Sequence, residues 1–94
     1  GIRAVIGDGT VIENSVVMGA DYYENEAPAG LPKLGIGRDC YISRAIIDKN
    51  ARIGDGCYIT PDGKPDPFES DLYTVRDGVI CIPKTTVLPA GTRL

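Results

Sequence analysis

The chain has 94 residues and a formal net charge of −3, from 10 Lys plus Arg against 13 Asp plus Glu. Its 43% hydrophobic and 24% charged residues are typical of one folded domain. No apolar run reaches the roughly 20 residues that span a membrane, and the N-terminus lacks a signal-peptide pattern, so we expect a soluble protein. The negative net charge argues against a broad nucleic-acid face, so an anion site must be a local cluster.

The chain contains no histidine. This excludes zinc sites built on imidazole, Ser-His-Asp triads and any mechanism with a histidine base. Three cysteines are too few for a four-thiolate metal site, and their odd number argues against a secreted disulfide framework. We therefore predict no metal site and a reducing compartment.

A repeat of six residues runs through the sequence. Large aliphatic residues recur at this spacing: Ile6, Ile12, Met18, Ile36, Ile42, Ile53, Ile59, Ile82, Leu88 and Leu94. One further step, from Ile42 to Ile47, is five residues, which a bent corner can absorb. A period of six does not fit a helix of 3.6 residues per turn, and Gly, Pro, Val, Ile and Thr predominate. The sequence predicts an all-β parallel β-helix, in which three short strands form a triangular coil of about 18 residues.

Small or β-branched residues follow the aliphatic positions by four: Thr10, Val16, Cys40, Ala51, Cys57, Thr86 and Thr92. We expect both classes of residue to point into the coil. Glycines lie between them and permit backbone angles that other residues avoid: Gly7, Gly9, Gly37, Gly54, Gly56 and Gly91. The spacing therefore predicts a strand, a turn and another strand on each side of the triangle.

The cysteines are predicted to be structural. Cys40 and Cys57 are one coil apart, so their α-carbons should lie about 5 Å from each other. Side chains stacked in parallel do not favour the torsion of a disulfide, so we interpret both as small buried hydrophobes. Cys81 is expected to face outward and has no assigned role.

Two segments break the repeat, at about 19–34 and 60–77. Both are rich in turn-forming residues, and we expect them to project from coil corners as inserted loops. The first contains Tyr22 and Tyr23. It either contacts a neighbouring domain or subunit or decorates the surface.

Four strings carry a family resemblance: Met18-Gly19-Ala20-Asp21-Tyr22-Tyr23, Gly35-Ile36-Gly37-Arg38, the run from Ala45 to Gly54, and Val87-Leu88-Pro89-Ala90-Gly91-Thr92. In this order they resemble the C-terminal β-helix of ADP-glucose pyrophosphorylase (glucose-1-phosphate adenylyltransferase) of the plant and cyanobacterial type. The resemblance extends over nearly the whole chain. It implies a left-handed parallel β-helix, with residues 1–94 as one domain in the C-terminal part of a longer enzyme.

The resemblance also implies what surrounds this domain. The intact enzyme makes ADP-glucose and pyrophosphate from ATP and glucose 1-phosphate, for glycogen or starch synthesis. Its N-terminal domain holds the catalytic residues, ATP and magnesium, so no cofactor is expected in residues 1–94. Expected partners are that domain, other subunits of a homo- or hetero-tetramer, and the effectors 3-phosphoglycerate and phosphate, in a bacterial cytoplasm or a plastid stroma.

By the same resemblance, Lys49 and Lys84 are the effector-binding lysines. Their spacing allows them to stack on adjacent coils if the segment 60–77 is excised. Arg52 and Arg44 lie near Lys49 in the sequence and are further candidates, because phosphate and carboxylate ligands need localised cations. Asp48 could instead neutralise Lys49.

Rival functions remain to be weighed. Hexapeptide acyltransferases and γ-type carbonic anhydrases share the expected fold but depend on histidine, which this chain lacks. The remaining alternative is a purely structural β-helix of another sugar nucleotidyltransferase, in which Lys49 and Lys84 are inert.

Overall fold

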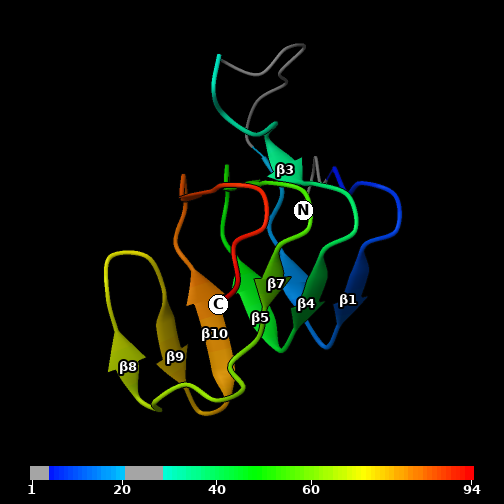
Figure 1. The fold of residues 1–94 in the computed structure, drawn as a ribbon. Helices are drawn as coiled ribbons and strands as arrows, with labels where there is room; N and C mark the ends of the chain where they lie inside the picture. The colour runs from blue at the N-terminus through cyan, green and yellow to red at the C-terminus, as the bar shows by residue number, and fades with distance from the viewer. Residues whose placement is uncertain (1–4, 21–28) are drawn as a thin grey trace.

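The computed structural model describes residues 5–20 and 29–94, and these residues form an all-β structure of short strands on three sheets. Sheet 1 contains β1 (Val11–Glu13), β4 (Tyr41–Ser43) and β7 (Tyr58–Ile59). Sheet 2 contains β3 (Gly35–Ile36), β6 (Arg52–Ile53) and β11 (Val87–Leu88). Sheet 3 contains β2 (Val16–Val17), β5 (Ala45–Ile47), β10 (Val79–Ile82), β9 (Thr74–Arg76) and β8 (Phe68–Glu69). Figure 1 shows the strands of sheet 1 side by side in the order β7, β4 and β1, with β3 of sheet 2 above them in the view.

Each sheet joins equivalent residues of successive coils by parallel pairing. In sheet 2, Ile53 pairs with both Ile36 and Leu88, and in sheet 3, Ile47 pairs with both Val17 and Ile82. Neighbouring parallel strands lie about 4.8 Å apart, so each coil repeats the positions of the one before it. The predicted parallel β-helix is confirmed.

The core is the column of aliphatic residues that the repeat predicted. These side chains are at most 4% exposed: Ile36, Ile42, Ile47, Ile53, Ile59, Ile82 and Leu88. Ile12 and Leu94 pack against them in the outer coils and are partly buried. Ile6, which the repeat also placed inside, pairs with Ile36 but is 45% exposed. Burial of each such side chain contributes about 1.5–3 kcal/mol, so the column is the main source of stability.

The first coil differs from the prediction at its third side. Val17, not Met18, pairs with Ile47 and packs against the core, while Met18 is 39% exposed. Val16 is 53% exposed and was also wrongly placed inside. Side chains alternate across a strand, so the register with β5 fixes which of two adjacent residues points inward. The five-residue step therefore occurs in the first coil as well as the second.

The glycines fall into two classes. Gly9, Gly56 and Gly91 have φ between 70° and 79°, as their predicted role requires. Gly7 and Gly54 are needed for space instead of backbone angle. A Cβ on Gly7 would lie 2.6 Å from the carbonyl carbon of Gly37, and one on Gly54 would lie 2.5 Å from the backbone nitrogen of Ala90.

The small inward residues form a hydrogen-bonded ladder beside this column. Thr10 Oγ1 donates to the Gly37 carbonyl at 2.7 Å, Cys40 Sγ to that of Gly54 at 3.2 Å, and Cys57 Sγ to that of Pro89 at 3.3 Å. Both cysteines are buried and free, which confirms the prediction. Cys81 is half-buried and pairs with the exposed Ile46, on the outer side of sheet 3.

The segment 60–77 is more ordered than a projecting loop. It contains β8 and β9, which form an antiparallel hairpin on the edge of β10 and bury Val75 (Figure 1). The two Asp66 carboxylate oxygens accept hydrogen bonds from the backbone nitrogens of Asp77 and Gly78, at 3.1 and 2.7 Å. The hairpin satisfies backbone groups that β10 would otherwise leave unpaired at its edge.

The segment 19–34 is described in part. Residues 29–34 lie over the outer side of sheet 2, and Leu34 is 9% exposed. Tyr22 and Tyr23 lie outside the described residues, and so does the choice between a contact with a neighbouring domain or subunit and a surface loop.

We expect Gly54→Ala to lower the free energy of unfolding by about 1–3 kcal/mol, because the added methyl group overlaps the Ala90 backbone. Gly56→Ala is the matched control, since nothing lies within 4 Å of its Cβ position. Its cost should be only the 1–2 kcal/mol, roughly, of a positive φ. Urea unfolding measures both variants. A Gly54→Ala protein as stable as wild type would contradict the close approach of the coils.

We expect Cys57→Thr to reduce the loss of stability at high pH. Burial raises the pKa of the Cys57 thiol above its ordinary value. The unfolded thiol ionises first, above about pH 8.5, so the folded state loses relative stability as the pH rises. Threonine occupies the equivalent position at Thr10, donates the same hydrogen bond and does not ionise there. Between pH 7 and 10, the free energy of unfolding should fall less with pH in the variant than in wild type. An equal fall in both proteins would contradict this prediction.

Candidate functional site

Lys49 and Lys84 occupy equivalent positions on adjacent coils. Ile47 pairs with Ile82, and the chain then runs in parallel so that the Thr85 backbone nitrogen donates to the Lys49 carbonyl at 3.0 Å. Their backbones are therefore separated by about one coil spacing of 4.8 Å. The Lys84 side chain is exposed and that of Lys49 is half-buried. The stacking predicted from the sequence is confirmed.

The turn that carries these lysines is tightly held. Asn50 and Thr85, the residues after them, both have φ of 61°, a conformation that is unusual for threonine. The Asn50 backbone nitrogen donates to the Gly19 carbonyl at 3.0 Å. The Asp48 carboxylate accepts a hydrogen bond from the Lys49 backbone nitrogen at 2.6 Å, so it caps the turn. The corner thus fixes the backbone from which both ammonium groups extend.

Arg52 does not join the lysines at the corner surface. Its side chain is 9% exposed, and Nη1 donates to the Pro32 carbonyl at 3.1 Å. Residues 29–34 cover it on the outer side of sheet 2. Arg52 therefore anchors this segment to the coil.

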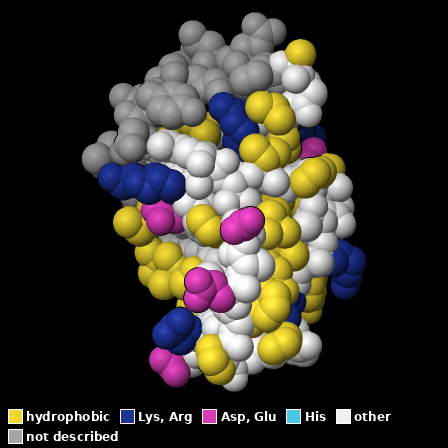
Figure 2. Space-filling view, turned by 90° about the vertical axis from the view of Figure 1, so that its left-hand side faces the viewer, with side chains coloured by type: hydrophobic (Ala, Val, Ile, Leu, Met, Phe, Trp, Pro, Cys, Tyr) yellow, Lys and Arg dark blue, Asp and Glu magenta, His cyan; other side chains and the backbone are white. Residues whose placement is uncertain are grey.

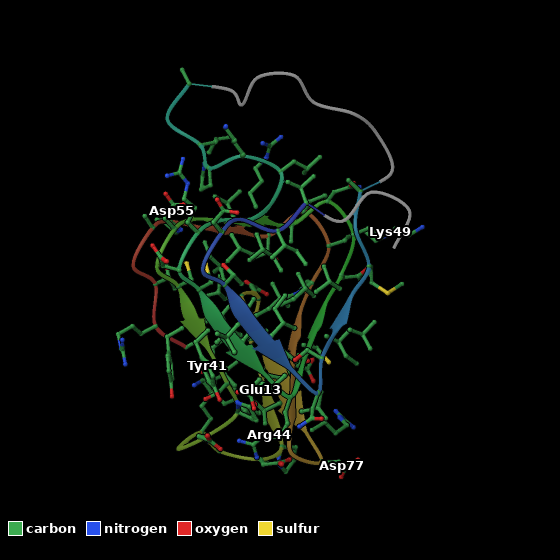
Figure 3. All side chains as sticks on the ribbon, turned by 90° about the vertical axis from the view of Figure 1, so that its right-hand side faces the viewer. Glu13, Tyr41, Arg44, Lys49, Asp55 and Asp77 are labelled. Carbon is green, nitrogen blue, oxygen red and sulfur yellow. The ribbon has the colours of Figure 1, made fainter. Side chains whose placement is uncertain are left out.

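Arg44 lies at a different corner of the triangle. Figure 3 looks along the solenoid and shows Lys49, Asp55 and Arg44 at its three corners. Strand β5 separates Arg44 from Lys49, and the exposed Arg44 guanidinium forms an ion pair with Asp62. The cluster of four cations expected from the sequence is thus divided, and only the two lysines are brought together.

A groove of about 590 Å³ lies beside residues 30–34 and contains none of the four predicted residues. Lys33 and Arg38 are the cations among its described residues, and the sequence did not point to either of them. In the sequence, the spacing of Gly7, Gly37 and Gly54 indicated a surface without side chains at this place. The repeat gave no position for residues 30–34, which form the wall of the groove.

Other classes of site receive no support from the described parts of the chain. Residues 5–20 and 29–94 contain no group of three or more His, Cys, Asp or Glu that could hold a metal ion. Within the same residues, no helix is long and apolar enough to cross a membrane.

The chain is similar to known proteins along nearly its whole length. A model of the GLGC left-handed parallel beta-helix domain matches residues 1–93. The small subunit of glucose-1-phosphate adenylyltransferase, chloroplastic/amyloplastic, of Triticum aestivum is 43% identical over 98% of this chain and 21% of its own length. The small subunit of glucose-1-phosphate adenylyltransferase of Zea mays is 41% identical, over 98% of this chain and 81% of that relative.

The chain spans about one fifth of the length of the Triticum aestivum relative. The parallel pairing, the three-sided coil and the column of buried aliphatic residues agree with the matched domain, which also gives the handedness. The chain therefore belongs to the family of GLGC left-handed parallel β-helix domains of glucose-1-phosphate adenylyltransferases.

Proposed function

We propose that these residues are the regulatory and oligomerising domain of a glucose-1-phosphate adenylyltransferase. The intact enzyme would make ADP-glucose and pyrophosphate from ATP and glucose 1-phosphate, for starch or glycogen synthesis. The family and the names of both relatives support this activity. ATP, magnesium and the catalytic groups would belong to another domain of the enzyme. The chloroplastic/amyloplastic relative favours a plastid over a bacterial cytoplasm.

The observation that carries the regulatory part is the stacking of Lys49 and Lys84. Two unit charges about 5 Å apart repel by about 1 kcal/mol in water and by about 3 kcal/mol at an effective dielectric constant of 20. A phosphate or carboxylate bound between the ammonium groups relieves this repulsion and forms charge-assisted hydrogen bonds. The site would take 3-phosphoglycerate or inorganic phosphate. Arg52 and Arg44 would act only indirectly, through the contacts that they make with Pro32 and Asp62.

The oligomerising part depends on surfaces outside the core. The relatives are named as small subunits, which supports assembly with other subunits. Val16 and Ile46 pair on the outer side of sheet 3 and are 53% and 39% exposed, so they form an apolar stripe. At the end of the solenoid beside the β8–β9 hairpin, hydrophobic side chains lie among scattered charges (Figure 2). We assign the Val16–Ile46 stripe to the subunit interface of a homo- or hetero-tetramer.

Lys84→Ala and Lys49→Ala in the full-length enzyme should each raise the 3-phosphoglycerate concentration for half-maximal activation by about tenfold, the effect of losing about 1.4 kcal/mol of binding. Turnover without activator should be unchanged, because neither lysine is assigned to catalysis. Steady-state activity titrated with 3-phosphoglycerate and with phosphate measures this. Lys84→Arg should keep most of the response, and Arg76→Gln, which changes an exposed cation on the hairpin, should keep all of it.

An equal fall in basal turnover and activated turnover would indicate a folding or interface defect in place of an effector role. An enzyme that is indifferent to both anions would leave the second candidate, a purely structural β-helix. The observation in favour of that candidate is the apolar Val16–Ile46 stripe, which can mediate assembly without any role for the lysines.

Ile46→Glu should shift the full-length protein toward smaller species, because a carboxylate placed in the Val16–Ile46 stripe has no partner when the subunits close. Light scattering after size exclusion measures the mass. Leu72→Glu is the matched control, since Leu72 is 41% exposed but lies in the turn between β8 and β9. An unchanged mass for Ile46→Glu would place the interface elsewhere.

A further inference from the structure

The groove of about 590 Å³ lies on the outer side of sheet 2, and its lining includes Asp55 (Figure 3). Its floor is the glycine column of Gly7, Gly37 and Gly54, continued by Pro89 and Ala90. Its wall is the segment from Gly30 to Leu34. Pockets that bind small molecules commonly measure about 300–1,000 Å³, so the groove has the volume of a ligand site.

The floor lacks side chains at its glycines because of the close packing of adjacent coils. Side chains are excluded there, because a Cβ on Gly7 or Gly54 would overlap the backbone of the next coil. The Arg38 backbone nitrogen also donates to Asp55 Oδ1 at 2.9 Å, which ties adjacent coils together at the edge of the groove. A ligand would therefore contact bare backbone that does not need to rearrange.

The wall is fixed from below by Arg52. The buried guanidinium holds the Pro32 carbonyl at 3.1 Å, and Leu34, two residues further on, is 9% exposed. The neighbouring Leu31 is 41% exposed and provides apolar surface on the wall. The wall is therefore anchored to the coil by a contact within the chain.

The charges of the lining are unbalanced. Lys33 and Arg38 are both exposed, and Asp55 is the one acidic residue among the described residues of the lining. Among residues 5–20 and 29–94, neither Lys33 nor Arg38 forms an ion pair with a carboxylate. On a chain with a net charge of −3, two cations beside the apolar side chains of Leu31, Pro89 and Ala90 favour a ligand that combines an anion with a flat body.

We propose that this groove binds a small molecule that carries one phosphate or carboxylate on a planar or apolar body. Lys33 and Arg38 bind the anion, and the body lies on the glycine floor against Leu31. The Asp55 carboxylate accepts a hydrogen bond from a hydroxyl or amino group of the ligand. This site is separate from the Lys49–Lys84 corner and does not depend on the function proposed for it.

The test follows the reactivity of the Lys33 amine in the full-length protein, by amine acylation and peptide mass spectrometry. Phenyl phosphate and benzoate supply the two anions on a planar body, and inorganic phosphate and phenol supply each part alone. Labelling follows the unoccupied fraction, so phenyl phosphate or benzoate at about twice its Kd should slow it by about threefold. At equal concentration, inorganic phosphate should protect less and phenol should not protect. Whichever of phenyl phosphate and benzoate protects Lys33 more strongly identifies the preferred anion.

Two variants remove different halves of the site. Arg38→Gln removes one cation, and Ala90→Leu fills the floor from an exposed position without changing the charge. Both should abolish protection of Lys33, while Arg76→Gln on the hairpin should retain it. Labelling of Lys49 and Lys84 in the same samples shows whether the corner still responds to phosphate. Thermal unfolding of each variant, compared with wild type, shows that the fold is retained.

Protection of Lys33 that survives both variants, or that inorganic phosphate matches at equal concentration, would overturn the proposal. So would the absence of protection by both aromatic anions at up to about 20 mM, which corresponds to a binding free energy weaker than about −2.3 kcal/mol. Because Lys33, Lys49 and Lys84 are read separately, failure of this site and failure of the effector corner are distinguishable.

Discussion

The spacing between adjacent coils governs the rest of this structure. Parallel strands pair at about 4.8 Å, so every position on one coil meets its equivalent on the next. At the start of each turn the backbones come so close that Gly54 has no room for a Cβ against Ala90. The column of buried isoleucines and the ladder of Thr10, Cys40 and Cys57 satisfy the same condition on the inside.

The stacking also determines which functional residues meet. It places Lys84 beside Lys49, although they are 35 positions apart in the sequence, and it separates Arg44 from Lys49 by a full side of the triangle. Closeness in sequence is therefore a poor guide to closeness in space on a solenoid. Cations at equivalent positions of adjacent coils form a pair, whereas cations five residues apart lie at different corners.

Insertions add what the repeating coil cannot provide. The hairpin of β8 and β9 covers the edge of β10, and its Asp62 neutralises Arg44. The segment from Gly30 to Leu34 converts a flat side into a groove, with Arg52 as its anchor. In both cases an arginine on the coil joins the insertion to the solenoid. The repeating coils thus form the frame, and the two insertions add charged groups and a groove to different sides of it.

The sequence alone determined the parallel β-helix, the buried isoleucines, the thiols of Cys40 and Cys57 and the stacking of the two lysines, because each follows from a period that the coils repeat. Only the tertiary structure decided the position of Val17 inside and Met18 outside, the strands within 60–77, the burial of Arg52 and the groove. A five-residue corner shifts the inward face by one position, and the pairing with β5 reveals that shift. The insertions obey no period, so their contacts depend on edges and surfaces that exist only after the coils have stacked.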